Sequence, residues 1–230
     1  MSVDRLDTAL APACCASPRQ DVALWLLDLD DPICQTFATK LSGAERERVG
    51  RLVFDRDRRR MAAARGALKV LLGVWVEQAP EQLRLSLRDG GKPWLPDHPG
   101  VFFNLSHSQN RALIALTRTG EVGVDLEVLR QTPDTLELAG RVFTPGEQAE
   151  LRAGEDAAGL DRRFLQGWTR KEACLKAAGW GLALDPQDFE VGTGADPRQI
   201  RLSHAGQRAD LDLMSLSLAP EVVAAMAVQR

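Results

Sequence analysis

The sequence predicts an α+β fold in which one chain of 230 residues forms two similar α+β halves. The main observation is that one order of elements, a strand, a short helix, a long helix and further strands, is indicated twice by the hydrophobic pattern. A hydrophobic content of 44% also supplies enough apolar side chains for a sizeable core. We therefore expect halves at residues 1–119 and 120–230, related by a pseudo-two-fold axis, with the active site in a cleft at their interface.

Capping signals and apolar periodicity indicate the elements of the first half. Ser42 is followed three residues later by Glu45, which is a capping box and predicts a helix start. Met61, Leu68 and Leu72 belong to an apolar stripe with helical spacing. The expected elements are a loosely held leader at 1–20, a strand at 23–28, helices at 42–54 and 58–76, a strand at 83–87, a turn at 89–91 and a hairpin of strands at 101–105 and 112–116.

The second half begins with a strand whose apolar residues alternate with polar ones. Thr144 as N-cap, Pro145 at the first helical position and Glu147 at the third predict a short helix. Gly179 gives the stop signal for a long helix. The expected elements are a strand at 122–128, helices at 144–152 and 160–178, and strands at 189–191, 200–203, 211–218 and 222–228.

Asp125 and Glu127 are candidate metal ligands because they share one face of the strand at 122–128. Their carboxylates branch from backbone positions about 7 Å apart, opposite the apolar face of the strand. An ordinary polar strand face has the same spacing. Close carboxylates repel each other unless positive charge lies between them, and Mg2+ prefers oxygen ligands of this kind.

Glu172 and Lys176 lie one turn apart on the long helix, on the same side as Trp168. A solvated Glu–Lys pair at this spacing stabilises a helix by about 0.3–0.5 kcal/mol and requires no active site. The alternative is that Glu172 meets Asp125 and Glu127 around one hard divalent cation.

Two further segments have the composition of phosphate-binding loops. Gly90-Gly91-Lys92 presents a lysine from a glycine-rich turn, and Asn104-Leu-Ser-His-Ser108 ends a strand with hydroxyl and imidazole groups. A plain hairpin turn and a polar strand end have the same patterns. Residues 45–69 contain nine basic and four acidic side chains in a chain of net charge −3, so this helical region is either a solvated face or an anion-binding surface.

Composition excludes several other classes. The four cysteines have no metal or disulfide-scaffold spacing, which favours a reducing, cytoplasmic setting, and the three histidines are too scattered for zinc. The N-terminus has acidic residues where a signal peptide needs a basic start, and no apolar run is long enough for a membrane span. The basic region lacks interleaved aromatic residues and the chain has no tyrosine, so we expect no nucleic-acid partner.

Taken together, the motifs resemble those of the two-domain, surfactin-synthetase type of phosphopantetheinyl transferases. The order and spacing of the motifs match across roughly residues 20–228, and the combination of Gly-x-Asp-x-Glu with Trp-x-x-Lys-Glu is highly specific. The motifs are Gly91-Lys-Pro-Trp94, Phe103-Asn-Leu-Ser-His-Ser108, Gly123-Val-Asp-Leu-Glu127 and Trp168-Thr-Arg-Lys-Glu-Ala173 with Lys176 and Gly179-Trp-Gly-Leu182.

The resemblance implies an enzyme that transfers the phosphopantetheine arm of coenzyme A to a serine of an acyl or peptidyl carrier protein and releases 3',5'-adenosine bisphosphate. It implies that Asp125, Glu127 and Glu172 hold Mg2+ against the pyrophosphate. Lys176 would bind the phosphate that leaves with the adenosine. Glu172 is also the candidate base for the serine proton, although a metal-bound water or Asp125 could serve instead, because a cation lowers the basicity of its carboxylate ligands.

The resemblance also assigns residues to the nucleotide end of coenzyme A. Lys92, Ser106 and His107 are expected to hold the 3'-phosphate and ribose, and the candidates from the basic region are Arg48, Arg60 and Arg65. The same positive charge could steer an acidic carrier protein towards the cleft. We expect a monomer without a membrane partner. Two alternative functions remain, a Mg2+-dependent phosphoester or pyrophosphate hydrolase and a nucleic-acid binder that uses the basic region.

Overall fold

The computed structural model describes residues 10, 13–153 and 157–230, which form helices and two antiparallel four-stranded sheets, an α+β fold as expected. The first sheet has the order β1 (Cys14–Cys15), β2 (Val22–Asp28), β6 (Arg111–Thr117) and β5 (Phe102–Ser108). The second has the order β7 (Val122–Val128), β10 (Val222–Gln229), β9 (Gln207–Leu216) and β8 (Arg198–His204). A two-stranded hairpin pairs β3 (Ser86–Leu87) with β4 (Pro93–Trp94).

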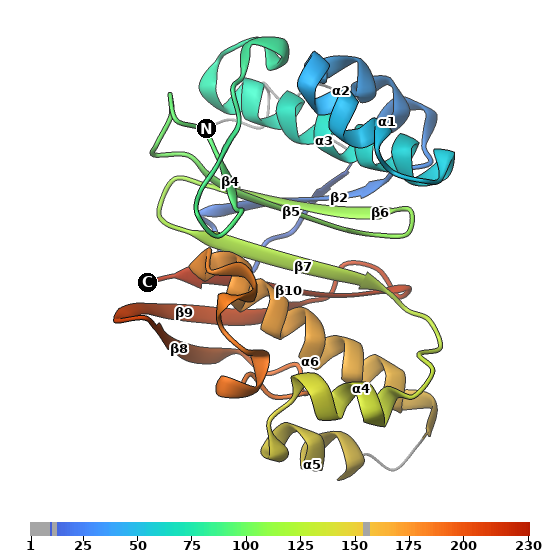
Figure 1. Ribbon diagram of the computed structural model, residues 1–230, viewed down its shortest axis with the longest axis vertical. Coiled ribbons are helices and arrows are strands. Elements are labelled where there is room, and N and C mark those ends of the chain that lie inside the picture. The colour runs from blue at the N-terminus through green and yellow to red at the C-terminus, as the bar shows by residue number, and fades with distance from the viewer. Residues whose placement is uncertain (1–9, 11–12, 154–156) are drawn as a thin grey trace.

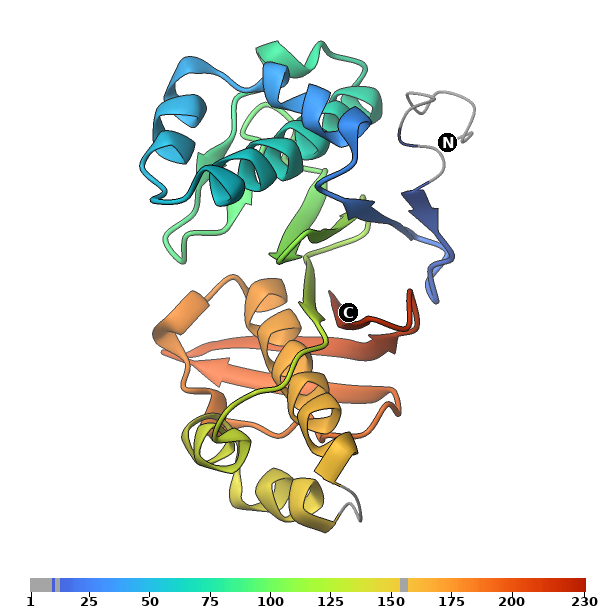
Figure 2. The ribbon, with the colours of Figure 1, turned by 90° about the vertical axis from the view of Figure 1, so that its right-hand side faces the viewer.

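The helices cover the faces of the two sheets that point away from each other (Figure 1). On the first sheet lies α3 (Asp55–Val76), with α1 (Pro32–Thr36) and α2 (Gly43–Gly50) packed against it. On the second lies α6 (Ala157–Ala178), with α4 (Thr135–Val142) and α5 (Pro145–Ala153) packed against it. The 3-10 helices are η3 (Phe37–Lys40), η4 (Pro80–Gln82), η5 (Gly181–Ala183) and η6 (Pro186–Asp188). Figure 2, turned by 90°, shows α6 lying across the second sheet.

The two sheets share one connectivity. In each, the first long strand pairs with the last, β2 with β6 and β7 with β10, and the last strand also pairs antiparallel with the strand before it. The longest helix of each half, α3 or α6, has 22 residues and lies between the paired strands in the chain. The change of sheet falls between residues 117 and 122, where we expect the halves to be joined.

The sheets pack face to face through a shared apolar layer. Val22 and Leu24 of β2 and Leu113 of β6 are buried in one cluster with Val124 and Leu126 of β7. Because neighbouring side chains of a strand point to opposite faces, this packing turns Asp125 and Glu127 away from the apolar layer. Separate clusters lie under α3 and under α6.

The capping boxes are as predicted, since the side chains of Ser42 and Glu45, and those of Thr144 and Glu147, bond each other's backbone N–H groups. Three other expectations are wrong in part. The strand expected at 83–87 is reduced to Ser86–Leu87, because residues 80–82 turn into a 3-10 helix. The helices of the first half are Gly43–Gly50 and Asp55–Val76, so the break comes earlier than expected. Cys14–Cys15, in the expected leader, pairs with β2, while residues 1–9 and 11–12 lie outside the described residues.

The strand expected at 189–191 is absent from the described second sheet. Buried side chains bond the backbone of this segment instead: the Arg170 guanidinium donates to the Val191 carbonyl, and Glu147 accepts the Val191 N–H. Lys171 donates to the Phe189 carbonyl. With these groups satisfied, the segment packs as an apolar loop. Among the described helices, none combines the length and the apolar composition that a membrane span requires.

Candidate active site

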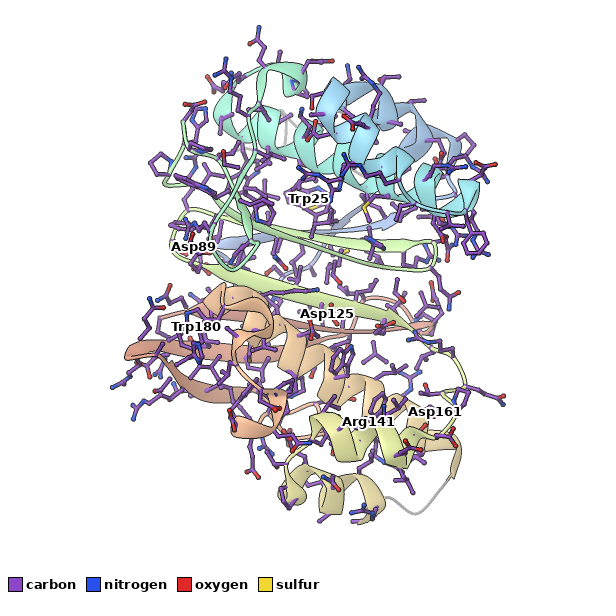
Figure 3. All side chains as sticks on the ribbon, in the orientation of Figure 1. Trp25, Asp89, Asp125, Arg141, Asp161 and Trp180 are labelled. Carbon is purple, nitrogen blue, oxygen red and sulfur yellow. The ribbon has the colours of Figure 1, made fainter. Side chains whose placement is uncertain are left out.

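A pocket of about 330 Å³ lies between the two halves of the chain. Asp125, labelled in Figure 3, lies on β7 beside α6 at this pocket. Three elements contribute the walls: Leu105, Ser106 and His107 come from β5, Asp125, Leu126 and Glu127 from β7, and Trp168, Glu172 and Lys176 from α6. The structure thus brings together six of the residues singled out in the sequence, although they are up to 70 positions apart.

Side chains of β5 connect the two sheets at this pocket. Asn104 Oδ1 accepts the N–H of Val124 at 2.9 Å, and Ser106 Oγ accepts the N–H of Leu126 at 3.3 Å. Ser108 Oγ does the same for Val128 at 3.3 Å. The N–H groups on the edge of β7 that faces away from β10 are therefore bonded by side chains of β5. These bonds fix the register of the two strands, because each joins residues that are 20 positions apart.

Asp125 is buried and interacts with both halves. Its Oδ1 accepts the Ser106 hydroxyl at 2.7 Å and lies 2.5 Å from the ammonium of Lys176. Its Oδ2 is buried and has no hydrogen-bond partner in the described part of the chain. Burial raises the pKa of Asp125, against the opposing effects of Lys176 and Ser106.

Glu127 and Glu172 differ in their partners. Glu127 Oε2 accepts the Ser108 hydroxyl at 2.6 Å and lies 2.6 Å from an Arg130 guanidinium nitrogen. The carboxylate of Glu172, by contrast, forms no hydrogen bond or ion pair with any residue that the structure describes, although its backbone lies within α6. Burial and then the negative charge of Asp125 raise the pKa of Glu172. A carboxylate in this state is a better proton acceptor than an exposed one.

Gly123 allows α6 to approach β7 closely. A Cβ at this position would lie 2.2 Å from the Ala173 carbonyl oxygen and 2.3 Å from the Ala177 nitrogen. Both atoms are helix backbone and cannot move aside cheaply. The glycine therefore sets the distance at which Glu172 and Lys176 face the carboxylates of β7.

The donor set at the pocket fits a hard cation but is not arranged as a closed ligand shell. Within the described ranges, no group of three or more His, Cys, Asp or Glu side chains is positioned to hold a metal. In this structure Lys176 pairs with Asp125, and Arg130 pairs with Glu127. The partnerless Oδ2 of Asp125 and the unpaired carboxylate of Glu172 nevertheless leave oxygen ligands available.

Lys92 does not line this pocket. Its ammonium lies 2.6 Å from Glu121 and donates to the carbonyl of Val122 at 2.8 Å, and its side chain is only 6% exposed. The turn that carries Lys92 also carries Asp89, which lies well away from Asp125 in Figure 3. The ammonium of Lys92, which the sequence suggested would bind the 3'-phosphate of coenzyme A, thus contacts protein groups instead.

The three candidate arginines have different surroundings. Arg60 pairs with Asp30 through two hydrogen bonds. Arg48 and Arg65 form no ion pair with any described residue, and the pKa of Arg65 is lowered by burial and then by the charge of Arg48. His107 lines the pocket wall, where loss of solvation at the ring and then the charges of Lys176 and Arg65 lower its pKa.

Sequence reasoning placed Ser108 in a candidate phosphate-binding segment and gave no role to Arg130, whereas both side chains contact Glu127. A signal for Ser108 was available, because Asn104, Ser106 and Ser108 follow the same two-residue spacing as the acids. For Arg130, three residues beyond Glu127 in a loop, no pattern indicates the contact.

Comparisons with known proteins point to one family. The family model of the 4'-phosphopantetheinyl transferase superfamily matches residues 121–225, which include the three acids and Lys176. The 4'-phosphopantetheinyl transferase HetI of Nostoc sp. is 39% identical over 197 residues, 83% of this chain and 82% of that protein. A putative 4'-phosphopantetheinyl transferase of Synechocystis sp. is 38% identical over 164 residues, 70% of this chain and 65% of that protein.

The 4'-phosphopantetheinyl transferase Sfp of Bacillus subtilis is 29% identical over 167 residues, 71% of this chain and 73% of that protein. These relatives are all named as transferases, so the hydrolase and nucleic-acid alternatives gain no support from them. The chain therefore belongs to the 4'-phosphopantetheinyl transferase superfamily.

Proposed function

We propose that the protein transfers the 4'-phosphopantetheine arm of coenzyme A to a serine of an acyl or peptidyl carrier protein. The single observation that carries this proposal is the convergence of Asp125, Glu127, Glu172 and Lys176 on one pocket between the two halves. Three carboxylates beside one ammonium suit a reaction on phosphate groups, where positioning and charge neutralisation supply most of the rate.

In this reaction the carrier serine oxygen bonds to the phosphorus that bears the pantetheine. The bond from that phosphorus to the bridging oxygen breaks, and 3',5'-adenosine bisphosphate leaves. We assign the serine proton to the carboxylate of Glu172, whose pKa is raised in the free protein. Because a bound cation lowers the basicity of its carboxylate ligands, Asp125 or a water is the alternative acceptor. Lys176 gives up its contact with Asp125 and donates to the departing phosphate, where it offsets the growing negative charge.

Asp125, Glu127 and Glu172 are the residues that would hold Mg2+. The cation, when bound, supplies Lewis-acid charge neutralisation to the pyrophosphate. The orphaned Oδ2 of Asp125 supports this assignment, since a buried carboxylate oxygen without a partner is costly unless something positive reaches it.

Arg48 and Arg65 are the stronger candidates for the 3'-phosphate, together with Ser106 and His107 of the pocket wall, because the charge of Arg65 acts on His107. The positive charge of Arg48 acts on Arg65 and outweighs the opposing charge of Glu45, and a bound anion would stabilise both guanidinium groups. Arg60 is already neutralised by Asp30. Lys92, expected from sequence to join this group, has its ammonium fully engaged by protein atoms.

The same proposal extends to the domain boundaries, the oligomeric state, the cellular compartment and the carrier proteins. We propose residues 1–119 and 120–230 as the two domains, and a monomer, because one chain supplies all three walls of the pocket. The free cysteines agree with a reducing cytoplasm. The carrier proteins served belong to fatty-acid, polyketide or nonribosomal peptide synthesis.

The test is incubation of the protein with an apo-carrier domain, coenzyme A and Mg2+, followed by mass spectrometry of the carrier. We expect the mass of one phosphopantetheine arm to be added to the carrier, no addition in the presence of EDTA, and a rate lower by about two to three orders of magnitude with Glu172→Gln. Cleavage of coenzyme A without any change in the carrier would instead support the hydrolase.

A further inference from the structure

Two glycine-rich motifs that are 90 residues apart in the chain pack backbone against backbone. The turn between β3 and β4 contains Gly90 and Gly91, and the latter has a φ of +79°. A Cβ on Gly90 would lie 1.8 Å from the Gly179 carbonyl oxygen, and one on Gly181 would lie 2.9 Å from the Gly90 carbonyl oxygen. Glycine is therefore required on both sides for the turn to reach the end of α6.

The side chain of Lys92, the residue after Gly91, is buried next to this contact. Its ammonium lies 2.6 Å from Glu121, donates to the carbonyl of Val122 at 2.8 Å and lies 3.5 Å from the carbonyl of Ala177. Glu121 is only 16% exposed and also pairs with Arg88 at 2.6 Å. One buried cation from the first half thus reaches the first residue of β7 and the last turn of α6.

Both of these segments lead directly to the candidate active site. Val122 is three residues before Asp125 on β7, and Ala177 follows Lys176 on α6. The last carbonyls of a helix have no partner within the helix, and a cation there is favourable. Lys92 therefore caps the turn that carries Lys176, and it ties that turn to the strand that carries Asp125.

We propose that Lys92 is a positioning residue of the transfer reaction: it fixes the end of α6 against the start of β7 and so holds Lys176 beside Asp125. This role replaces the contact with the 3'-phosphate of coenzyme A that the sequence suggested. The inference rests on the proposed function, because it assigns Lys92 a part in the same chemistry through Lys176.

The affinities for 3',5'-adenosine bisphosphate and 5'-AMP distinguish a positioning role of Lys92 from direct binding of the 3'-phosphate. A contact with the 3'-phosphate would make Lys92 responsible for preferring 3',5'-adenosine bisphosphate over 5'-AMP. We expect Lys92→Met to keep the ratio of the two dissociation constants within about threefold of the parent, while kcat at saturating coenzyme A falls at least about tenfold. Loss of the preference with an unchanged kcat would overturn the proposal.

A double-mutant cycle tests whether Lys92 acts through Lys176. We expect kcat of the double variant Lys92→Met/Lys176→Ala to equal that of Lys176→Ala within about threefold. Without the Lys176 ammonium, Lys92 has no group left to position. Multiplicative losses would show that Lys92 acts independently, against the proposal. Arg88→Met is the matched control in the same turn, since it removes one partner of Glu121 but no contact with α6, and it should keep kcat within about threefold.

Hydrogen exchange tests the positioning role without any activity. The Gly179 N–H bonds the Leu175 carbonyl at 3.0 Å in the last turn of α6. We expect this amide to exchange at least about tenfold faster in Lys92→Met and within about threefold of the parent rate in Arg88→Met. Equal exchange rates in Lys92→Met and the parent would overturn the proposal.

Should Lys92→Met not fold, Lys92→Arg serves in the same experiments, because the larger guanidinium cannot keep all three contacts. A parent that modifies no carrier would refute the proposed function, while exchange at Gly179 still decides the role of Lys92.

Discussion

The hydroxyl of Ser108 donates to Glu127 at 2.6 Å while it accepts the N–H of Val128 at 3.3 Å. The backbone N–H occupies one acceptor site of the hydroxyl, so its proton points at the carboxylate. A strand of the first half therefore orients an acid of the second half. The same arrangement holds for Ser106 with Leu126 and Asp125.

Ser108→Ala should weaken metal binding and slow the transfer. The substitution frees Glu127 to rotate and leaves the Val128 N–H unsatisfied, which costs about 1–3 kcal/mol. We expect Mn2+ affinity, measured by electron paramagnetic resonance in the presence of coenzyme A, to fall about threefold to tenfold. Ser203→Ala, exposed on β8, is the control. Unchanged Mn2+ affinity in Ser108→Ala would remove Glu127 from the ligand set.

Glu172→Gln should abolish most activity without loss of stability. The folded-state pKa of Glu172 is raised above its ordinary value of 4.5, so the ionised form costs stability once the pH rises through the folded pKa. Glutamine removes that cost. We expect carrier modification to fall by about two to three orders of magnitude.

Thermal unfolding checks the sign of this effect. Near neutral pH the Glu172→Gln variant should be at least as stable as the parent, and its advantage should disappear below pH 4.5, where the parent carboxyl is protonated in both states. A lower unfolding temperature for the variant at neutral pH would mean that the ionised carboxylate has a stabilising partner in the free protein.

Gly123→Ala should disrupt the contact between β7 and α6. The added methyl would lie within 2.3 Å of two backbone atoms of α6, so we expect a loss of about 2–3 kcal/mol in the free energy of unfolding. Gly140→Ala on α4 is the control, because its Cβ would meet no atom within 4 Å and should be neutral or stabilise by up to about 1 kcal/mol. Urea titration of both variants measures the difference, and equal stabilities would contradict the close approach.

Arg48→Met and Arg65→Met should each weaken the binding of 3',5'-adenosine bisphosphate, by about tenfold, and reduce its preference over 5'-AMP. Arg60→Met serves as the comparison, since its guanidinium is held by Asp30. Calorimetric titration of the three variants checks this order. A larger loss for Arg60→Met than for the other two would place the 3'-phosphate elsewhere.

Local patterns were sufficient to predict much of this molecule. The alternation of β7 places Asp125 and Glu127 on one face, and helical spacing places Glu172 above Lys176, because both depend only on neighbouring residues. Capping boxes at Ser42 and Thr144 are equally local.

Contacts between distant segments could not be predicted in this way. Residues 189–191 have strand composition, yet Arg170, Lys171 and Glu147 bond their backbone. Lys92 has the setting of a phosphate-binding lysine in sequence, and only the packing of its turn on α6 shows that its ammonium is enclosed. The paired state of Arg60 likewise depends on where Asp30 lies.

The most direct measurement is a crystal structure with coenzyme A and Mn2+, in which anomalous scattering locates the metal. We expect one Mn2+ in contact with Asp125, Glu127, Glu172 and the pyrophosphate, with Lys176 moved from Asp125 to a phosphate oxygen. Coenzyme A bound with no metal at these three carboxylates, or bound away from the pocket between the halves, would contradict the proposed function.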